Sequence, residues 1–139
     1  MQIPTDLKEL IPRDKHDHKR AEAAINAGYP AVDPILWELL EWIQDMNWPV
    51  AQTLAPFLSS IGLPLVPYIE RIFETDDEVW KYWIMGAIMR YSREVAEAFR
   101  EVVTRIAYAP TENELNEELP GQALYILELY GWQKQQSDL

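Results

Sequence analysis

The feature that most constrains the fold of this chain is an apolar helical pattern that recurs at intervals of 30 to 34 residues. The segment Pro34–Leu36 is matched 33 positions later by Pro67–Ile69, and Val50 is matched 30 positions later by Trp80. In an array of this kind, each pair of helices buries one face on the preceding pair and one on the next. The interval predicts a short HEAT-like helix-pair solenoid, and an irregular helical bundle is the alternative.

The remaining patterns are also helical. Strand-like alternation of apolar and polar residues is nearly absent, whereas apolar residues at helical spacing recur between prolines and glycines. We therefore predict an all-α chain of about seven or eight helices that forms a single domain over residues 1–139. Residues 1–16 would be a lead-in to the fold and residues 133–139 a frayed tail. The expected helices span residues 5–10, 17–27, 33–44, 49–61, 66–74, 77–91, 92–106 and 111–130.

Several residues mark the expected helix ends. Asp33 and Asn47 lie just before proline-containing helix starts and are expected to act as N-caps. Asp76 or Asp77 is expected to cap the helix over residues 77–91. Thr111 and Glu114 have the spacing of a capping box, in which each side chain bonds to the backbone of the other residue. Within the last helical segment, Pro120-Gly121 predicts a break close to that pair.

Composition limits the cell compartment and the chemistry. The chain has no cysteine, which excludes disulfides, thiol catalysis and thiolate zinc sites. Its first residues lack the apolar core of a signal peptide, and no apolar run approaches the roughly 20 residues of a membrane helix. We therefore expect a cytoplasmic protein.

The net charge of −11 is concentrated in two parts of the chain. Residues 31–89 hold nine acids and two bases, and residues 111–139 hold six acids and one base. Such a field repels nucleic acids and anionic membranes, because both require clusters of lysine and arginine. It would attract a basic protein or peptide.

Four sequence motifs carry a resemblance to a known family. They are Ile11–Asp17, Asp45–Ala51, Asp76–Ile84 and Pro110–Glu112, and the two longer tryptophan-containing motifs are the most specific. Together they resemble a family of short bacterial proteins known only as domain of unknown function 5071, over roughly residues 11–129. The resemblance implies a HEAT-like all-α fold. It implies no activity, substrate or catalytic residue.

A small group of ionisable residues near the start was considered as a metal site. His16 and His18 lie among Asp14 and Asp17, and these side chains are common ligands of divalent metals. Two histidines at i and i+2 of a helix point apart, and the aspartates suit a helix start better. We predict no metal and no cofactor, and the alternative is a small metal- or ligand-dependent enzyme that uses Asp14, Asp17 or Asp45.

A second set of carboxylates, Glu38, Glu41 and Asp45, shares one side of an expected helix. Paired carboxylates can perform acid–base catalysis, but here they are expected to be the solvated stripe of an otherwise apolar helix. The chain has no glycine-rich phosphate loop and no metalloprotease motif. An enzymatic function therefore has no motif to support it.

Aromatic residues supply the other candidate site. Trp48 and Trp80 are expected near the starts of equivalent helices, and Lys81 and Trp83 follow directly on the second helix. An aromatic rim with acidic neighbours would suit a basic peptide or an Arg/Lys-bearing loop. The alternative is that these tryptophans belong to the core.

The sequence therefore predicts a non-enzymatic module that binds a protein or basic peptide and neither nucleic acid nor membrane. One specific version is an immunity protein that masks a basic toxin, since a small acidic helical chain suits that role electrostatically.

Overall fold

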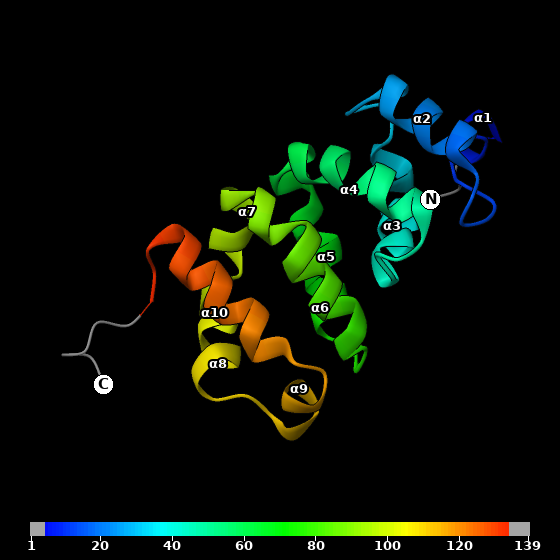
Figure 1. Cartoon of the computed structure of the whole chain (residues 1–139). Coiled ribbons are helices and arrows are strands. Elements are labelled where there is room, and N and C mark those ends of the chain that lie inside the picture. The colour runs from blue at the N-terminus through cyan, green and yellow to red at the C-terminus, as the bar shows by residue number, and fades with distance from the viewer. Residues whose placement is uncertain (1–4, 134–139) are drawn as a thin grey trace.

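The structure is a computed structural model that describes residues 5–133, and it confirms the all-α prediction (Figure 1). Within that range the chain forms ten α-helices and four short 3₁₀ helices, without a strand. The α-helices are α1 (Thr5–Lys8), α2 (His18–Ala27), α3 (Leu36–Leu40), α4 (Pro49–Ile61), α5 (Val66–Phe73), α6 (Glu78–Ala87), α7 (Arg93–Ala98), α8 (Arg100–Tyr108), α9 (Glu112–Asn116) and α10 (Leu119–Tyr130). The 3₁₀ helices are η1 (Asp33–Ile35), η2 (Glu41–Gln44), η3 (Leu63–Leu65) and η4 (Met89–Tyr91).

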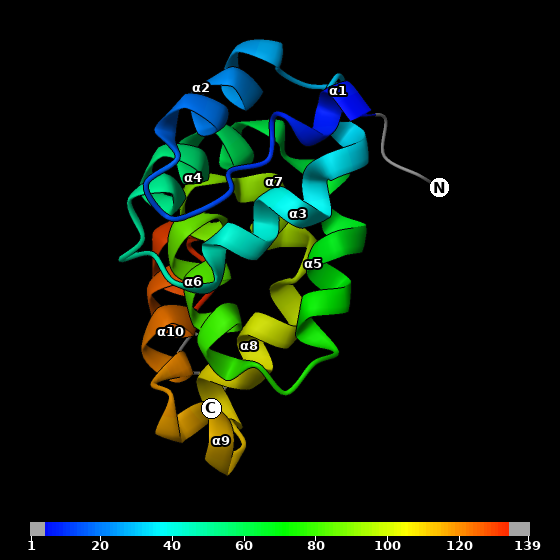
Figure 2. The same cartoon turned by 90° about the vertical axis from the view of Figure 1, so that its right-hand side faces the viewer.

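The helices lie in two adjoining rows. Figure 2 shows α2, α4, α6 and α10 following one another down the molecule, with α3, α5 and α8 beside them. Helices that are consecutive in the first row contact each other, and α5 and α8 pack on α6 and α10 respectively. Stacked helix pairs would give such rows. The more specific assignment to a HEAT-like solenoid stays a prediction.

The core runs between the two rows and consists mainly of aliphatic side chains. Burying one of these side chains contributes roughly 1.5–3 kcal/mol, so together they contribute much of the stability of the fold. Fully buried large side chains include Ile35, Leu36, Leu39, Leu40, Ile43, Leu54, Leu58, Leu65, Ile69, Ile72, Ile84 and Met85.

Helix starts differ in how their free backbone N–H groups are satisfied. The carboxylate of Asp77 accepts a hydrogen bond from the backbone N–H of Trp80 at 3.0 Å, as the sequence predicts for the start of α6. The predicted caps Asp33 and Asn47 are wrong. Asp33 lies inside η1, and Trp48 occupies the cap position of α4 without a side-chain hydrogen bond. Prolines in the first turn of η1 and α4 already hold the helical φ and have no N–H to satisfy.

The last predicted helix is divided in two, and the break lies next to Leu119. Thr111 and Glu114 form the predicted capping box at the start of α9. Glu118 adopts a left-handed conformation with φ of 61° and separates α9 from α10. Pro120 then lies in the first turn of α10, where its missing N–H is not needed.

There are more helices than expected because several of the predicted helices are divided into shorter ones. The segment predicted as one helix over 33–44 consists of α3 between η1 and η2. The segment predicted over 92–106 is divided between α7 and α8 at Phe99, whose buried ring stacks on Phe73 with ring centroids 5.5 Å apart. Tertiary packing of this ring accompanies a break that local sequence patterns do not indicate.

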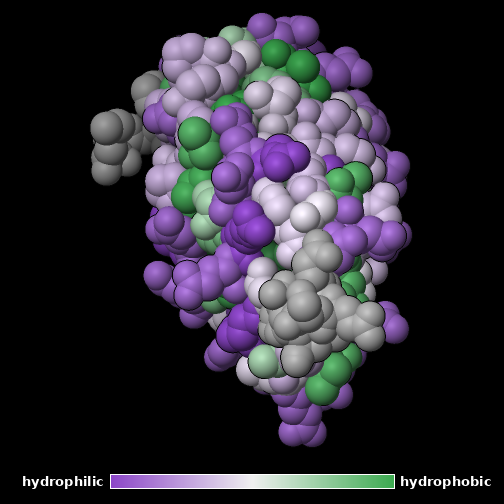
Figure 3. Space-filling model, turned by 90° about the vertical axis from the view of Figure 1, so that its left-hand side faces the viewer, coloured by the Kyte–Doolittle hydropathy of each residue, from purple (hydrophilic) through white to green (hydrophobic). Residues whose placement is uncertain are grey.

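Hydrophobic side chains that remain at the surface are dispersed. On the face shown in Figure 3, hydrophobic residues form separate patches between hydrophilic ones. The most exposed large hydrophobic side chain among those described is that of Tyr91, at 70%. Scattered exposure of this kind is normal for a folded chain, and so it does not by itself mark a site.

Between residues 5 and 133, no single helix has the length and apolar character needed to cross a membrane. One pair, Pro49–Ile61 with Leu63–Phe73, passes that test by length and composition when taken together, but it bends by 109° at the break.

Candidate functional site: an apolar cleft between α4, α6 and α10

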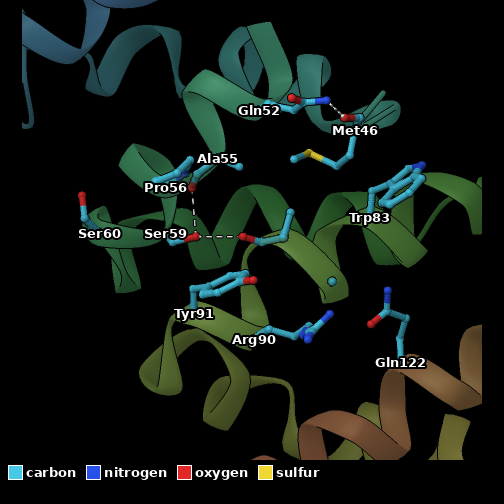
Figure 4. Close-up of a pocket in the computed structure, with 12 residues that line it drawn as sticks. Met46, Gln52, Ala55, Pro56, Ser59, Ser60, Trp83, Arg90, Tyr91 and Gln122 are labelled. Carbon is cyan, nitrogen blue, oxygen red and sulfur yellow. Dashed lines mark hydrogen bonds between the residues drawn. The ribbon is translucent and has the colours of Figure 1, made fainter. Parts of the chain in front are cut away.

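A cleft of about 610 Å³ opens between α4, α6 with η4, and the start of α10 (Figure 4). This volume lies within the range of about 300–1,000 Å³ that is typical of ligand pockets. The lining is mainly aliphatic and aromatic, with a few amide, hydroxyl and guanidinium groups. It consists of Met46, Gln52, Ala55, Pro56, Ser59, Ser60, Trp83, Gly86, Ala87, Arg90, Tyr91 and Gln122.

The two long walls of the cleft are equivalent faces of two successive helices in the first row. Each wall has five residues at helical spacing i, i+3, i+4, i+7 and i+8, which places them on one face. Every residue of the second wall follows its counterpart by 31 positions, an interval within the predicted repeat. The walls are Gln52, Ala55, Pro56, Ser59 and Ser60 on α4, and Trp83, Gly86, Ala87, Arg90 and Tyr91 on α6 and η4.

A buried hydroxyl joins the two walls. The Ser59 Oγ lies 2.9 Å from the carbonyl oxygen of Ala55 and 3.0 Å from that of Ala87 (Figure 4). Its single proton is shared between these two acceptors, so the hydroxyl is fixed and holds α4 against α6. This contact keeps the base of the cleft at a defined width.

The third side of the cleft depends on a glycine. A Cβ atom added at Gly86 would collide with the side-chain amide of Gln122. Because Gly86 has no side chain, the Gln122 amide from α10 can lie directly against α6 beside the cleft. Gly86 is helical and is not at positive φ, so close approach is the reason for a glycine at this position.

Polar groups surround the apolar lining at the mouth. The Gln52 Nε2 donates to the carbonyl oxygen of Met46 at 3.1 Å, which ties the loop before α4 to the helix. The Arg90 guanidinium carbon lies 3.8 Å from the ring centroid of Tyr125, a cation–π contact that holds the arginine towards α10. An apolar hollow with fixed polar groups at its edge is suited to binding, because apolar contact provides affinity and the polar groups set orientation.

The predicted aromatic residues do not share one rim. Trp83 is half-buried, lines the cleft and contacts Tyr82 edge-on with ring centroids 4.9 Å apart. Trp80 is only 6% exposed, and its indole Nε1 donates to the carbonyl oxygen of Leu40 at 3.2 Å. The structure therefore places Trp83 at the cleft and Trp80 in the core.

Lys81 is also withdrawn from the surface. It is 7% exposed, and its ammonium group lies 3.0 Å from the Glu78 carboxylate one turn earlier. The sequence predicts Lys81 on an open rim, but the structure shows it buried. The long apolar stem of a lysine can pack among core side chains while its charge is paired locally.

Trp48 lies at a second, smaller hollow of about 310 Å³. Its half-buried ring meets Trp42 edge-on, with ring centroids 5.5 Å apart, and Glu38 and Glu41 line the same hollow. Burial raises the pKa of Glu41, and the charge of Glu38 raises it further. Glu41 is nevertheless exposed, as expected of a solvated stripe, whereas Glu38 is half-buried.

Asp17 and Asp14 have structural partners near the start of α2. The Asp17 carboxylate accepts hydrogen bonds from the backbone N–H groups of Arg13 at 3.0 Å and Arg20 at 3.3 Å. The bond from Arg13 is the main cause of the lowered pKa of Asp17. Asp14 accepts from the backbone N–H of His16 at 2.9 Å. Both carboxylates therefore stabilise the turn that leads into α2.

Asp45 has a similar local role, since it accepts from the backbone N–H of Asn47 at 2.9 Å in the loop before α4. The part of the chain from residue 5 to residue 133 brings no three His, Asp or Glu residues together in a geometry that could hold a metal ion.

Sequence reasoning identified Trp83 but missed most of the cleft. Of the described residues that line it, only Arg90 is charged and none belongs to a catalytic motif, so a search for catalytic or charged motifs overlooks the cleft. The one usable signal was the repeat: the cleft walls recur at 31 residues, and extending the helix alignment beyond the core positions would have paired them. The approach of Gln122 to Gly86 has no local signal, because these residues lie on different helices.

A sequence profile described as Domain of unknown function (DUF5071) matches residues 10–127. The chain belongs to this family. A comparison with curated protein sequences found no match to the chain. The description of the DUF5071 family specifies no activity, and the function is therefore argued from the cleft itself.

Proposed function

We propose that this DUF5071 protein is a non-enzymatic binding module that accepts an apolar side chain of a partner protein or peptide in the cleft. The observation that carries this proposal is the pair of matching helical walls on α4 and α6, which enclose an apolar volume with Trp83 and Tyr91 on one wall. Aromatic residues are enriched where proteins bind one another because they offer a large contact area at low entropic cost.

The polar groups of the cleft support binding more than catalysis. The Ser59 hydroxyl is buried and already bonded to two carbonyl oxygens, which leaves it poorly placed to act as a nucleophile. The Gln52 and Gln122 amides lie at the edge, where they can exchange hydrogen bonds with the backbone of an extended segment. A helix or a strand that carries one large apolar residue would fit this arrangement.

Charge would govern how fast the partner arrives. With a net charge of −11, the protein attracts basic partners and repels acidic ones over distances of about one Debye length. We expect association to slow as salt rises, while the apolar contact in the cleft keeps dissociation nearly constant.

Selection from a random peptide library displayed on phage tests the proposal with a matched pair of variants. Gly86→Leu fills the cleft with a side chain and displaces the flexible end of Gln122. Gly121→Leu makes the same substitution at an exposed helical glycine whose added Cβ has no neighbour within 4 Å. Both variants gain helix propensity of roughly 0.8–1 kcal/mol, which helps to keep them folded.

The proposal predicts that peptides enriched on the wild type share an apolar residue beside lysine or arginine. Their affinity should fall at least tenfold for Gly86→Leu and stay within twofold for Gly121→Leu. Equal binding to both variants, or no enrichment on the wild type, would refute binding in the cleft. Circular dichroism melts of both variants verify that the comparison is made between folded proteins.

A further inference from the structure

The smaller hollow beside the cleft has a different chemistry from the cleft itself. It is bordered by Glu38, Glu41, Trp42 and Trp48, so that two carboxylates and two indoles meet at one place. Met46, which lines the cleft, lies two residues before Trp48. The loop between η2 and α4 therefore runs between the two hollows.

Helical spacing brings these groups together. Glu41 and Trp42 follow Glu38 by three and four positions along α3 and η2, which places the three side chains on one face. Trp48 arrives from the start of α4, and its ring meets Trp42 at an interplanar angle of 75°. The two indoles thus form adjoining walls at nearly right angles, with the carboxylates beside them.

One carboxylate oxygen of this group lacks a partner. The Glu38 Oε2 is buried and has no hydrogen-bond donor, and none of the ion pairs found within residues 5–133 involves Glu38. Buried acceptors in native proteins nearly always have a donor, so an orphaned carboxylate oxygen requires an explanation. The neighbouring Glu41, an exposed residue that lines the same hollow, adds a second negative charge.

We infer that this hollow binds a basic side chain, lysine or arginine, presented by the partner protein. An ammonium or guanidinium group there would donate to the carboxylates of Glu38 and Glu41 and balance their charges. Its positive charge would also be attracted to the faces of Trp42 and Trp48. The inference rests on the proposed binding function only for the source of the cation, and it is tested without any protein partner.

The test uses the full ¹⁵N-labelled chain and follows the indole N–H signals of Trp42 and Trp48 by NMR. The probes are Nα-acetyl-lysine methylamide and Nα-acetyl-arginine methylamide, with the neutral Nε-acetylated lysine as the uncharged control. Isolated amino acids bind weakly, so titration extends into the millimolar range. We expect saturable shifts of both indole signals with the cationic probes and at least fivefold weaker binding of the neutral one.

Variants separate the two kinds of contact. Glu38→Gln should weaken binding of the cationic probes at least fivefold, whereas Glu101→Gln, at an exposed position on α8, should leave it unchanged. Trp42→Leu keeps an apolar side chain but removes the indole face, so it should also weaken binding of the cationic probes. In this variant the affinity is measured from the indole N–H signal of Trp48, because that of Trp42 is lost. Equal shifts with charged and neutral probes, or equal affinity in Glu38→Gln and the wild type, would overturn the inference. Gly86 does not line this hollow, so the cleft test succeeds or fails independently.

Discussion

The Glu114 carboxylate joins α9 to α8 through Arg105. The guanidinium nitrogens of Arg105 donate to Glu114 Oε1 at 2.9 Å and to Oε2 at 2.6 Å. The same Oε1 accepts from the backbone N–H of Thr111 at 2.8 Å, which completes the capping box. Glu101 lies four positions before Arg105 on α8, at the spacing of a surface ion pair. Arg105 turns to Glu114 because a bidentate, largely buried carboxylate offers stronger hydrogen bonds than a solvated neighbour.

Removing the Glu114 charge should destabilise the C-terminal part of the fold. Glu114→Gln loses the ion pair and weakens the capping box, and we expect a loss of about 1–2 kcal/mol in the free energy of unfolding. The value is modest because the Arg105 side chain is 44% exposed and regains water. Urea denaturation measures the change, with Glu101→Gln as a control expected within about 0.5 kcal/mol of the wild type.

The same carboxylate makes stability depend on pH. Hydrogen bonding from Arg105 is the main cause of the lowered pKa of Glu114. Its contribution is fully present above the unfolded-state pKa of about 4.3 and is lost as pH falls through the folded-state pKa. The stability difference between wild type and Glu114→Gln should therefore be constant near neutral pH and shrink below about pH 4.3. A difference that stays constant down to pH 3 would contradict this assignment.

The same substitution should destabilise the protein to different extents at the two tryptophans of α6. Trp80→Phe removes the buried hydrogen bond to the Leu40 carbonyl and leaves a small cavity, which should cost about 2 kcal/mol or more. Trp83→Phe, at the half-buried cleft wall, should cost less than about 1 kcal/mol. Equilibrium unfolding of both variants measures the two costs, and similar values would contradict the division between core and cleft.

The turn after α4 requires a glycine for two separable reasons. Gly62 has φ of 78° and ψ of −131°, a conformation that costs other residues roughly 1–3 kcal/mol. An added Cβ would also collide with the carboxylate of Glu94 on α7. Gly62→Ala should therefore be destabilising, and less so when Glu94 is replaced by alanine. A double-mutant cycle should give a coupling of about 0.5 kcal/mol or more, and zero coupling would show that backbone strain acts alone.

Local signals predicted much of the fold. The Asp77 cap, the Thr111–Glu114 capping box and the break next to Leu119 all depend on residues within four positions of one another, and these predictions are confirmed. The caps expected at Asp33 and Asn47 failed although they have the same local form, because prolines start those helices without a side-chain cap.

Relationships between helices could not be read from such signals. Trp80 and Trp83 lie three positions apart on the same helix, and no local pattern tells which of them is buried. The packing of α6 on α3 and η2 buries Trp80. The contact of Gln122 with Gly86 and the pairing of Glu114 with Arg105 likewise join separate helices. A candidate site formed by apolar walls is predicted only when the repeat is followed out to the surface positions.

The central claim, that the cleft binds an apolar side chain, is tested most directly by NMR with the best peptide from the phage selection. The signals to follow are the Trp83 indole, the Gln52 and Gln122 side-chain amides and the Met46 methyl group, which surround the cleft. The account predicts that these four signals shift together and saturate with one affinity, while those of the Gly86→Leu variant do not move. Shifts confined to residues outside the cleft, with these four signals unchanged, would contradict it.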